Sequence, residues 1–159
     1  MRFFEDMEIG AHREIGSFTF TAENIKTFAG QFDPQRFHLD AEEGRNSLFG
    51  GLAASGWHVG CVCMKLLVAD GQRAIREAMA RGEQVAVWGP SPGFRELRWI
   101  RPVLAGDTIS FSSRVESKRV SDSRPGWGIL QARNTGTNQR GEDVYSMLAT
   151  AFVPRRSAD

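Results

Sequence analysis

The feature that most constrains this fold is an apolar stretch near the middle of the chain, residues 56–69, which reads GWHVGCVCMKLLVA. Ser55 precedes it and is a natural helix N-cap, because a serine hydroxyl accepts a hydrogen bond from a free amide of the first turn. A helix that is apolar almost all round cannot lie on a protein surface and must be wrapped by other elements. We therefore expect a buried central helix that begins after Ser55.

Strand patterns on both sides of this helix provide a sheet that can wrap it. Residues 12–21 alternate well enough for one strand before the helix. Five further strands are predicted after it, over Val85–Trp88, Phe94–Val103, Thr108–Ser121, Trp127–Thr137 and Val144–Pro154. The segments SRPG and NQRGE, between the later strands, have the composition of hairpin turns. One buried helix with a run of antiparallel strands indicates an α+β protein in which a curved antiparallel sheet wraps around a central helix, the hotdog fold.

The rest of the chain is expected to form helices and one irregular segment. Thr21 is a suitable N-cap for a helix that Asp33-Pro34 would end, because proline cannot continue a helix. The apolar face of that helix holds Ile25, Phe28, Ala29 and Phe32. Residues 33–54 are predicted to form a structured loop with one short helix after Asp40. A separate polar, amphipathic helix is expected over Gln72–Arg81.

Charge and composition exclude several classes of protein. Twenty Lys and Arg residues against nineteen Asp and Glu give a net charge of +1, which offers no general attraction to nucleic acid or to an anionic membrane. No window approaches the roughly 18 continuous apolar residues that span a bilayer, and the N-terminal MRFFEDMEIG lacks the apolar core of a signal peptide. We expect one cytoplasmic domain over residues 1–159. Its sheet would leave an edge strand open, so pairing with a second copy, as a homodimer or higher homo-oligomer, is expected.

The two cysteines and the tryptophans suggest packing roles. Cys61 and Cys63 are one residue apart in the central helix, so their side chains point in different directions and suit neither a disulfide nor a shared metal site. We expect both to be small buried hydrophobes. The three histidines are scattered, and we predict no metal and no other cofactor. Trp88, Trp99 and Trp127 are expected to pack in the sheet or in a dimer.

The loop before the central helix carries a recognisable set of motifs. These are Asp33-x-x-x-x-His38-x-Asp40, Phe49-Gly50-Gly51 and Ala54-Ser55-Gly56. Further along lie Pro92-Gly93, Glu96-Leu97-Arg98-Trp99 and Arg101-Pro102-Val103-x-x-Gly106-Asp107. Together, from Phe3 to Arg155, they resemble the MaoC-like dehydratases, the (R)-specific enoyl-CoA hydratase group. The Pro-Val-x-x-Gly-Asp turn occurs more widely among hotdog proteins and mainly indicates the fold.

The resemblance implies a cofactor-free hydro-lyase that reversibly hydrates a trans-2-enoyl-CoA to a 3-hydroxyacyl-CoA. Such a reaction needs a base for water, an acid for Cα and donors for the charge that grows on the thioester oxygen. By resemblance, Asp33 and His38 form the acid-base pair, and the backbone N–H of Gly56, at the positive end of the helix dipole, is the oxyanion donor. The expected partner is an acyl-CoA thioester, and the expected substrate-binding residues are Ser55, Gln35, Arg36, Phe49, Gly51 and Arg98.

Several positions depart from the pattern of this family. The usual Asp-x-Asn-Pro-x-His reads DPQRFH here, with Gln35 in place of Asn and Arg36 adding a cation. A cation that points inward would lower the pKa of both Asp33 and His38. Ser55 stands where many members have His, and Met64, which hydrogen-bonds poorly, stands where some have a water-binding Ser.

Plain structural roles remain open for the same residues. Asp33 can be a turn residue, His38 a loop histidine bonded to a backbone carbonyl, Asp40 a helix cap, and His58 a packed or interface histidine. Ser55 can be a cap or a substrate contact. Two other functions also fit the sequence. One is a hotdog thioesterase, in which a carboxylate activates water against the thioester carbonyl, and the other is a non-catalytic acyl-CoA-binding partner subunit.

Three arginines lie on or beside the strand predicted over Phe94–Val103. Strict alternation along that strand would put Arg98 on the face opposite Arg95 and Arg101. Near the site such a set can hold the phosphates of coenzyme A, whereas elsewhere it is a solvated strand face.

Overall fold

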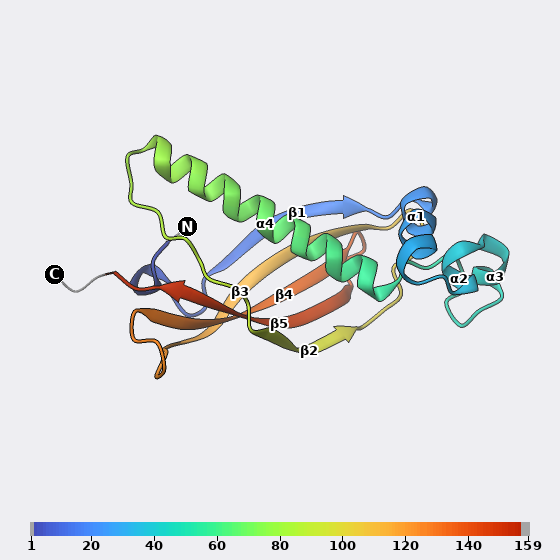
Figure 1. The fold of residues 1–159 in the computed structure, drawn as a ribbon. Helices are drawn as coiled ribbons and strands as arrows, with labels where there is room; N and C mark the ends of the chain where they lie inside the picture. The colour runs from blue at the N-terminus through green and yellow to red at the C-terminus, as the bar shows by residue number, and fades with distance from the viewer. Residues whose placement is uncertain (1, 157–159) are drawn as a thin grey trace.

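The structure, a computed structural model, describes residues 2–156 and is built on one five-stranded antiparallel sheet (Figure 1). The strands are β1 (His12–Thr19), β2 (Gly93–Trp99), β3 (Thr108–Val120), β4 (Trp127–Asn138) and β5 (Asp143–Pro154), in the spatial order β1-β3-β4-β5-β2. Helix α4 (Gly56–Ala80) lies along one face of this sheet, and a short 3-10 turn, η1 (Phe4–Asp6), precedes β1. The predicted α+β arrangement, an antiparallel sheet around a central helix, is confirmed.

The core lies between α4 and the sheet. Val59 and Cys63 of α4 share one buried cluster with Ile109 and Phe111 of β3 and with Tyr145 of β5. A large apolar side chain that is fully buried contributes about 1.5–3 kcal/mol relative to an exposed one. This packing therefore fixes the first half of α4 against the middle of the sheet.

Helix α4 is longer than the sequence suggests. The separate helix predicted over Gln72–Arg81 is wrong as a boundary, because α4 runs without a break from Gly56 to Ala80. Asp70 and Gly71 look like helix breakers in the sequence, but both are buried within the helix. The Asp70 carboxylate pairs with Arg13 of β1 at 3.0 Å, and this ion pair holds the middle of α4 to the sheet edge. Asp70 also pairs with Arg73 one turn later in the same helix at 2.5 Å.

The segment between α4 and β2 holds no regular strand, so the strand predicted over Val85–Trp88 is wrong. In the described chain this segment runs beside β5 but is joined to it by one backbone hydrogen bond, from Gly89 N–H to the Phe152 carbonyl at 2.8 Å. Its other anchors are the buried side chain of Ala86 and the indole of Trp88, which donates to the Arg2 carbonyl. The side chains of this segment attach it to the core, although it forms no ladder of backbone hydrogen bonds with β5.

A bulge in β2 changes which face its arginines occupy. Between Arg95 and Arg98 the strand register shifts, so that these residues pair with Leu148 and Ser146, which lie two apart on β5. Both arginines therefore share the outer face of the sheet, opposite α4, and the predicted alternation between Arg95 and Arg98 is wrong. Trp99 pairs with Tyr145 and lies on the α4 side.

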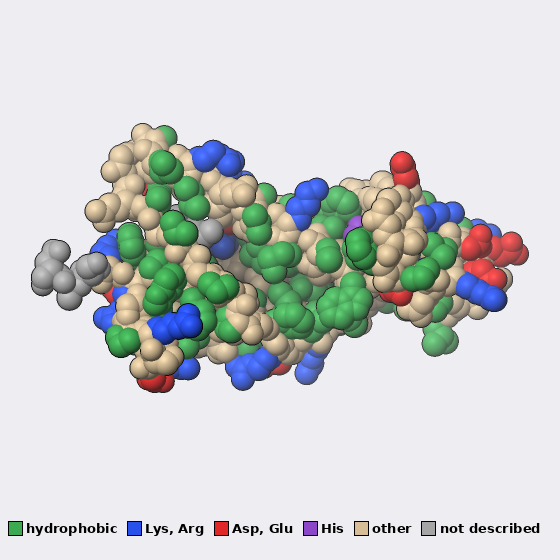
Figure 2. All heavy atoms as spheres, viewed as in Figure 1, with side chains coloured by type: hydrophobic (Ala, Val, Ile, Leu, Met, Phe, Trp, Pro, Cys, Tyr) green, Lys and Arg blue, Asp and Glu red, His purple; other side chains and the backbone are tan. Residues whose placement is uncertain are grey.

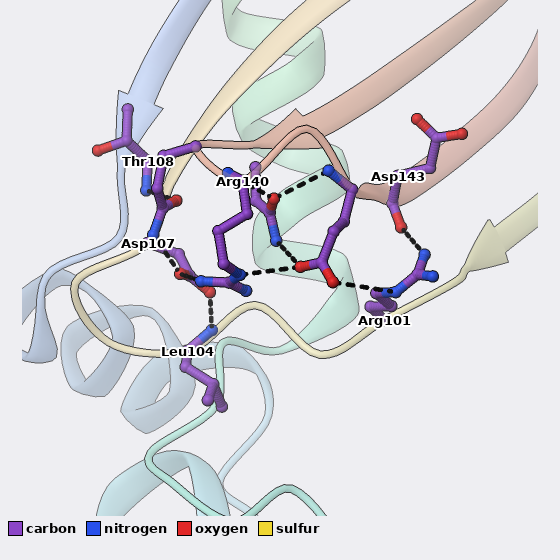
Figure 3. Close-up of polar contacts among 9 residues, drawn as sticks. Arg101, Leu104, Asp107, Thr108, Arg140 and Asp143 are labelled. Atoms are coloured by element: carbon purple, nitrogen blue, oxygen red, sulfur yellow. Dashed lines mark hydrogen bonds and ion pairs between the residues drawn. The ribbon is translucent and has the colours of Figure 1, made fainter.

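The Pro-Val-x-x-Gly-Asp turn, which leads into β3, is joined to the turn between β4 and β5 at one end of the sheet (Figure 3). The buried carboxylate of Asp107 accepts hydrogen bonds from the backbone N–H of Leu104 at 2.9 Å and from the Gln139 side chain at 2.8 Å. It also pairs with Arg140 at 3.3 Å, in the predicted turn between β4 and β5. Arg101 donates to the Asp143 carbonyl at 2.8 Å. These contacts are structural, and they occupy the arginines of this corner.

Next to this turn the chain approaches the loop before α4. Ala53 forms an isolated antiparallel bridge with Leu104, and Ala105 N–H donates to the Leu52 carbonyl at 2.9 Å. Ala54 N–H donates to the Val103 carbonyl at 2.8 Å. The backbone at residues 52–54 is thus held by the loop between β2 and β3.

One face of α4 is not covered within the chain. Its exposed side chains recur at intervals of four, three and four residues, and we call this set the helix stripe: Trp57, Cys61, Met64 and Val68. The expectation that Cys61 is buried is wrong, whereas Cys63 is buried as expected. Figure 2 shows hydrophobic side chains gathered over α4 and the adjoining β2, where Phe94 and Trp99 are also exposed.

Two further features concern the described chain as a whole. None of its helices combines the length and the apolar character that a bilayer crossing requires. Residues 2–156 also hold no group of three or more His, Cys, Asp or Glu side chains arranged to hold a metal ion.

Candidate active site

Helix α1 (Ala22–Phe32) positions the first candidate residue, Asp33, at its C-terminal end. As predicted, the Thr21 side chain caps it by accepting a hydrogen bond from Asn24 N–H at 3.2 Å. The helix ends at Asp33, whose N–H donates to the Ala29 carbonyl at 2.9 Å, and Pro34 cannot continue it. Asp33 therefore lies at the C-terminal end of α1, facing the loop that leads to α4.

Two short helices follow, where the sequence predicted one. Helix α2 (Arg36–Leu39) carries His38, and α3 (Ala41–Arg45) follows directly. The carboxylate of Asp40 accepts hydrogen bonds from the N–H groups of Glu42 and Glu43 at 2.8 and 3.0 Å, which confirms it as the cap of α3. A helix of four residues is too short to show periodicity, so α2 left no signal in the sequence.

Asp33 and His38 meet across this loop. Nε2 of His38 lies 3.4 Å from Oδ2 of Asp33, and the His38 residue is only 5% exposed. Nδ1 of His38 lies 2.7 Å from the carbonyl oxygen of Ala53. A carbonyl can only accept, so Nδ1 carries a proton, and Nε2 is the nitrogen that faces Asp33. The ring is thereby aimed at the carboxylate.

The surroundings of Asp33 favour its ionised form. Burial raises the pKa of Asp33. The Ser55 hydroxyl, the Gln35 amide and the His38 ring lower it by more than burial raises it, so the pKa of Asp33 lies below its usual value. Nε2 of Gln35 donates to Oδ1 of Asp33 at 2.8 Å. Gln35, which stands where the usual motif has Asn, thus donates a side-chain amide hydrogen bond to Asp33.

Gly56 opens α4 beside this pair. The Ser55 hydroxyl accepts from Trp57 N–H at 3.2 Å, so Ser55 is the N-cap of α4, and its side chain also faces Asp33. Among residues 2–156 no acceptor is found for Gly56 N–H. A β-carbon at position 56 would overlap the indole of Trp99, so glycine is required here by a neighbouring ring. The free amide and the positive end of a 25-residue helix can stabilise a developing negative charge.

The other predicted substrate-binding residues divide into two groups. The Phe49 ring lies 6.1 Å from the His38 ring and 5.1 Å from the Phe37 ring, and the Cα of Gly51 faces the Leu104 side chain. These residues line the loop around the dyad. Arg36 is exposed at the start of α2 and forms no ion pair with Asp33 or with any other residue in the described part of the chain.

Arg98 lies elsewhere. It is exposed on the outer face of the sheet, where its pairing partner Ser146 accepts a hydrogen bond from Arg133 at 3.4 Å. The sheet therefore separates the Arg98 side chain from α4 and its first turn. The structure does not bring Arg98 together with Asp33 and His38.

Comparison with known proteins places this arrangement in context. Residues 7–147 match the family model described as FAS1-like, dehydratase domain region. A MaoC-like dehydratase from Rhodospirillum rubrum is 36% identical, with a TM-score of 0.79 over 99% of this chain and 100% of that one. The protein YdeM of Bacillus subtilis is 33% identical over 151 residues, 95% of this chain and 98% of its own. A mesaconyl-CoA hydratase of Cereibacter sphaeroides is 36% identical over 64 residues, which are 40% of this chain and 18% of that protein.

Proposed function

Because the chain belongs to the MaoC-like dehydratase family and has its hotdog fold, we propose that it reversibly hydrates a trans-2-enoyl-CoA to a 3-hydroxyacyl-CoA. The observation that carries this proposal is the 3.4 Å approach of the His38 imidazole to the Asp33 carboxylate, beside the free N–H of Gly56. A base, an acid and an oxyanion donor thus lie in one place.

The dyad supplies the proton transfers. In the forward direction water adds its hydroxyl to Cβ of the enoyl group and a proton is added to Cα. One member of the Asp33–His38 pair takes the proton that water loses, and the other returns a proton to Cα, so the proton content of the pair is unchanged after each turnover. Because the Ala53 carbonyl binds Nδ1 of His38, Nε2 faces Asp33 and is the nitrogen that would transfer the proton.

The first turn of α4 supplies the electrostatic part. Addition at Cβ places negative charge on the thioester oxygen, and Gly56 N–H would donate a hydrogen bond to it. The carboxylate of Asp33 is held ionised by its neighbours, which suits a base. The mesaconyl-CoA hydratase similarity supports a CoA thioester as the substrate. The (R) configuration of the product follows the family resemblance.

A homodimer is part of the proposal. Strand β2 is a sheet edge, and its exposed Phe94 and Trp99 lie beside the helix stripe. A two-fold axis at this edge would pair β2 with its copy in antiparallel orientation and bring two helix stripes together, which covers the open edge and the apolar face at once. Sedimentation of Met64→Glu, against the control Met79→Glu on the exposed C-terminal turn of α4, tests this. A dimer that Met64→Glu leaves intact contradicts it.

The enzymatic proposal is tested by following the 2-enoyl-thioester absorbance of a short panel, crotonyl-CoA included, alongside a free-thiol assay. Loss of the enoyl band without thiol release supports hydration. Thiol release would indicate a thioesterase instead. Calorimetric binding of the esters with neither reaction would indicate a binding subunit, in which Asp33→Asn changes nothing.

A further inference from the structure

The bulge in β2 decides which face of the sheet carries Trp99. In a regular strand Trp99, four residues after Arg95, would share the outer face with that arginine. Between Arg95 and Arg98, however, β2 takes three residue steps while β5 takes two. Trp99 consequently pairs with Tyr145, whose side chain lies in the core under α4. The extra residue of the bulge is therefore what places Trp99 on the α4 side.

The backbone of this bulge is strained at Glu96. Its φ is 52°, and within residues 2–156 it is the one residue other than glycine with a positive φ. A side chain in this conformation crowds its own backbone, so such residues persist only where other contacts hold them, and they are concentrated at functional sites. The Glu96 carboxylate pairs with Arg133 of β4 at 2.6 Å, and Arg133 also pairs with Glu116 of β3. Ion pairs across three strands thus hold the bulge from the outer face.

On the opposite face, Trp99 packs directly on Gly56. A β-carbon at position 56 would overlap three atoms of the Trp99 indole, so the ring lies against the α-carbon of Gly56. The Trp57 ring meets the same indole edge to face, with the centroids 5.4 Å apart. Trp99 is 47% exposed, so burial in the core does not explain why its ring lies there.

This contact concerns the amide that serves as oxyanion donor in the proposed function. Gly56 is the first residue of α4, and a glycine has no side chain to restrict its own backbone. A ring packed on the α-carbon supplies the missing restriction. Oxyanion donors are effective because they are held in place before the negative charge develops. A contact that fixes Gly56 therefore affects the rate of the reaction more than the binding of the substrate.

We propose that Trp99 is a positioning residue for the Gly56 amide, and that the strained bulge at Glu96 is what turns the indole onto Gly56. The role of Gly56 as oxyanion donor rests on the proposed function. Trp99 acts through Gly56 and does not need to touch the reacting atoms.

The first experiment needs no substrate. Protons that lie over the face of an indole are shifted upfield in NMR spectra, so the Hα signals of Gly56 report where the Trp99 ring lies. Trp99→Ala should move these signals downfield, towards ordinary glycine values. Phe94→Ala is the matched control and should leave them in place, because Phe94 precedes the bulge on the same strand and is similarly exposed, at 50%. Gly56 signals that do not move in Trp99→Ala overturn the proposal.

The role of the bulge is tested by two substitutions at Glu96 that both remove the carboxylate. Glu96→Gly tolerates a positive φ freely, whereas β-branched valine tolerates it least, so Glu96→Val should distort the bulge. The Gly56 signals should therefore stay near their wild-type positions in Glu96→Gly and move towards those of Trp99→Ala in Glu96→Val. Glu96→Ala replaces the valine variant if that variant does not fold. Equal signals in the glycine variant and its partner overturn the role of the Glu96 conformation.

The catalytic part is tested by steady-state kinetics with crotonyl-CoA, normalised to folded protein. Trp99→Ala should lower kcat about tenfold or more with little change in KM, because a misplaced oxyanion donor is lost mainly in the transition state. Trp99→Phe keeps a ring over Gly56 and should recover part of the loss. Phe94→Ala should keep the wild-type kcat, which separates the effect from a weakened dimer edge.

Equal kcat values for Trp99→Ala and Phe94→Ala overturn the positioning role of Trp99. Failure of the proposed function gives a different result, since the wild type would then hydrate no ester of the panel. In that case the catalytic role of Trp99 fails with it, while the Gly56 signals still decide whether the Glu96 bulge holds the indole on Gly56.

Discussion

His38 and His58 are buried almost equally, at 5% and 6% exposure, yet their surroundings differ in kind. His38 has a polar partner for each nitrogen, the Ala53 carbonyl and the Asp33 carboxylate. His58 is enclosed by phenylalanine rings, and its Nδ1 has no partner in the described chain. Burial alone therefore does not indicate proton transfer. His58 is kept neutral by its apolar surroundings, because burial lowers its pKa to about 4.

The largest expected effect concerns the polar side of this comparison. Asp33→Asn keeps the shape of the side chain but removes its basicity, so hydration of crotonyl-CoA should slow roughly a hundredfold or more. The measurement is the rate of loss of the enoyl absorbance. Asp122→Asn, an exposed substitution in the turn between β3 and β4, is the matched control and should leave the rate unchanged. Equal rates for the two variants would remove Asp33 from the mechanism.

The two histidines should also differ in what they contribute to stability. His38→Phe leaves the Ala53 carbonyl without its partner and should lower the free energy of unfolding by about 1–3 kcal/mol. His58→Phe removes an unpaired buried nitrogen and should leave the stability equal or raised. Urea unfolding of both variants measures the contrast. A loss at position 58 as large as that at position 38 would show that His58 has a partner inside the protein.

The smallest effect concerns the proton affinity of Asp33. Its pKa is lowered in the folded protein, so ionisation of Asp33 stabilises the fold above its unfolded pKa, and that stability is lost as the pH falls through the folded pKa. Gln35→Leu removes one donor and should raise the pKa of Asp33 towards the ordinary value. The acid limb of activity should then move to higher pH. Carboxyl ¹³C titration of both proteins checks this, and an unchanged Asp33 pKa would contradict it.

The sequence predicted the elements whose signal is local. The apolar run after Ser55 and the alternation of the later strands are properties of neighbouring residues, and the caps at Thr21, Asp40 and Ser55 follow from their hydroxyl or carboxylate groups. Side-chain direction along β2 was mispredicted because a bulge is a property of two paired strands. The exposure of Cys61 was missed for a related reason, since one chain leaves part of α4 uncovered.

The candidate site was only partly accessible to the same reasoning. The spacing of Asp33 and His38 placed both in one loop, and the family resemblance gave them roles, but their approach depends on α2, which has no periodic signal. Arg98 was selected for its charge, and the sheet places it on the far face.

The bridge between Ala53 and Leu104 carries a consequence for the chemistry of His38. The Ala53 carbonyl is positioned by a backbone strip that the Asp107 turn holds through Leu104 N–H. The tautomer of the His38 imidazole therefore depends on the Asp107 turn at the end of the sheet, and not only on the loop in which His38 lies. A substitution at Asp107 should therefore change which nitrogen of the His38 ring carries the proton, although Asp107 does not contact that ring.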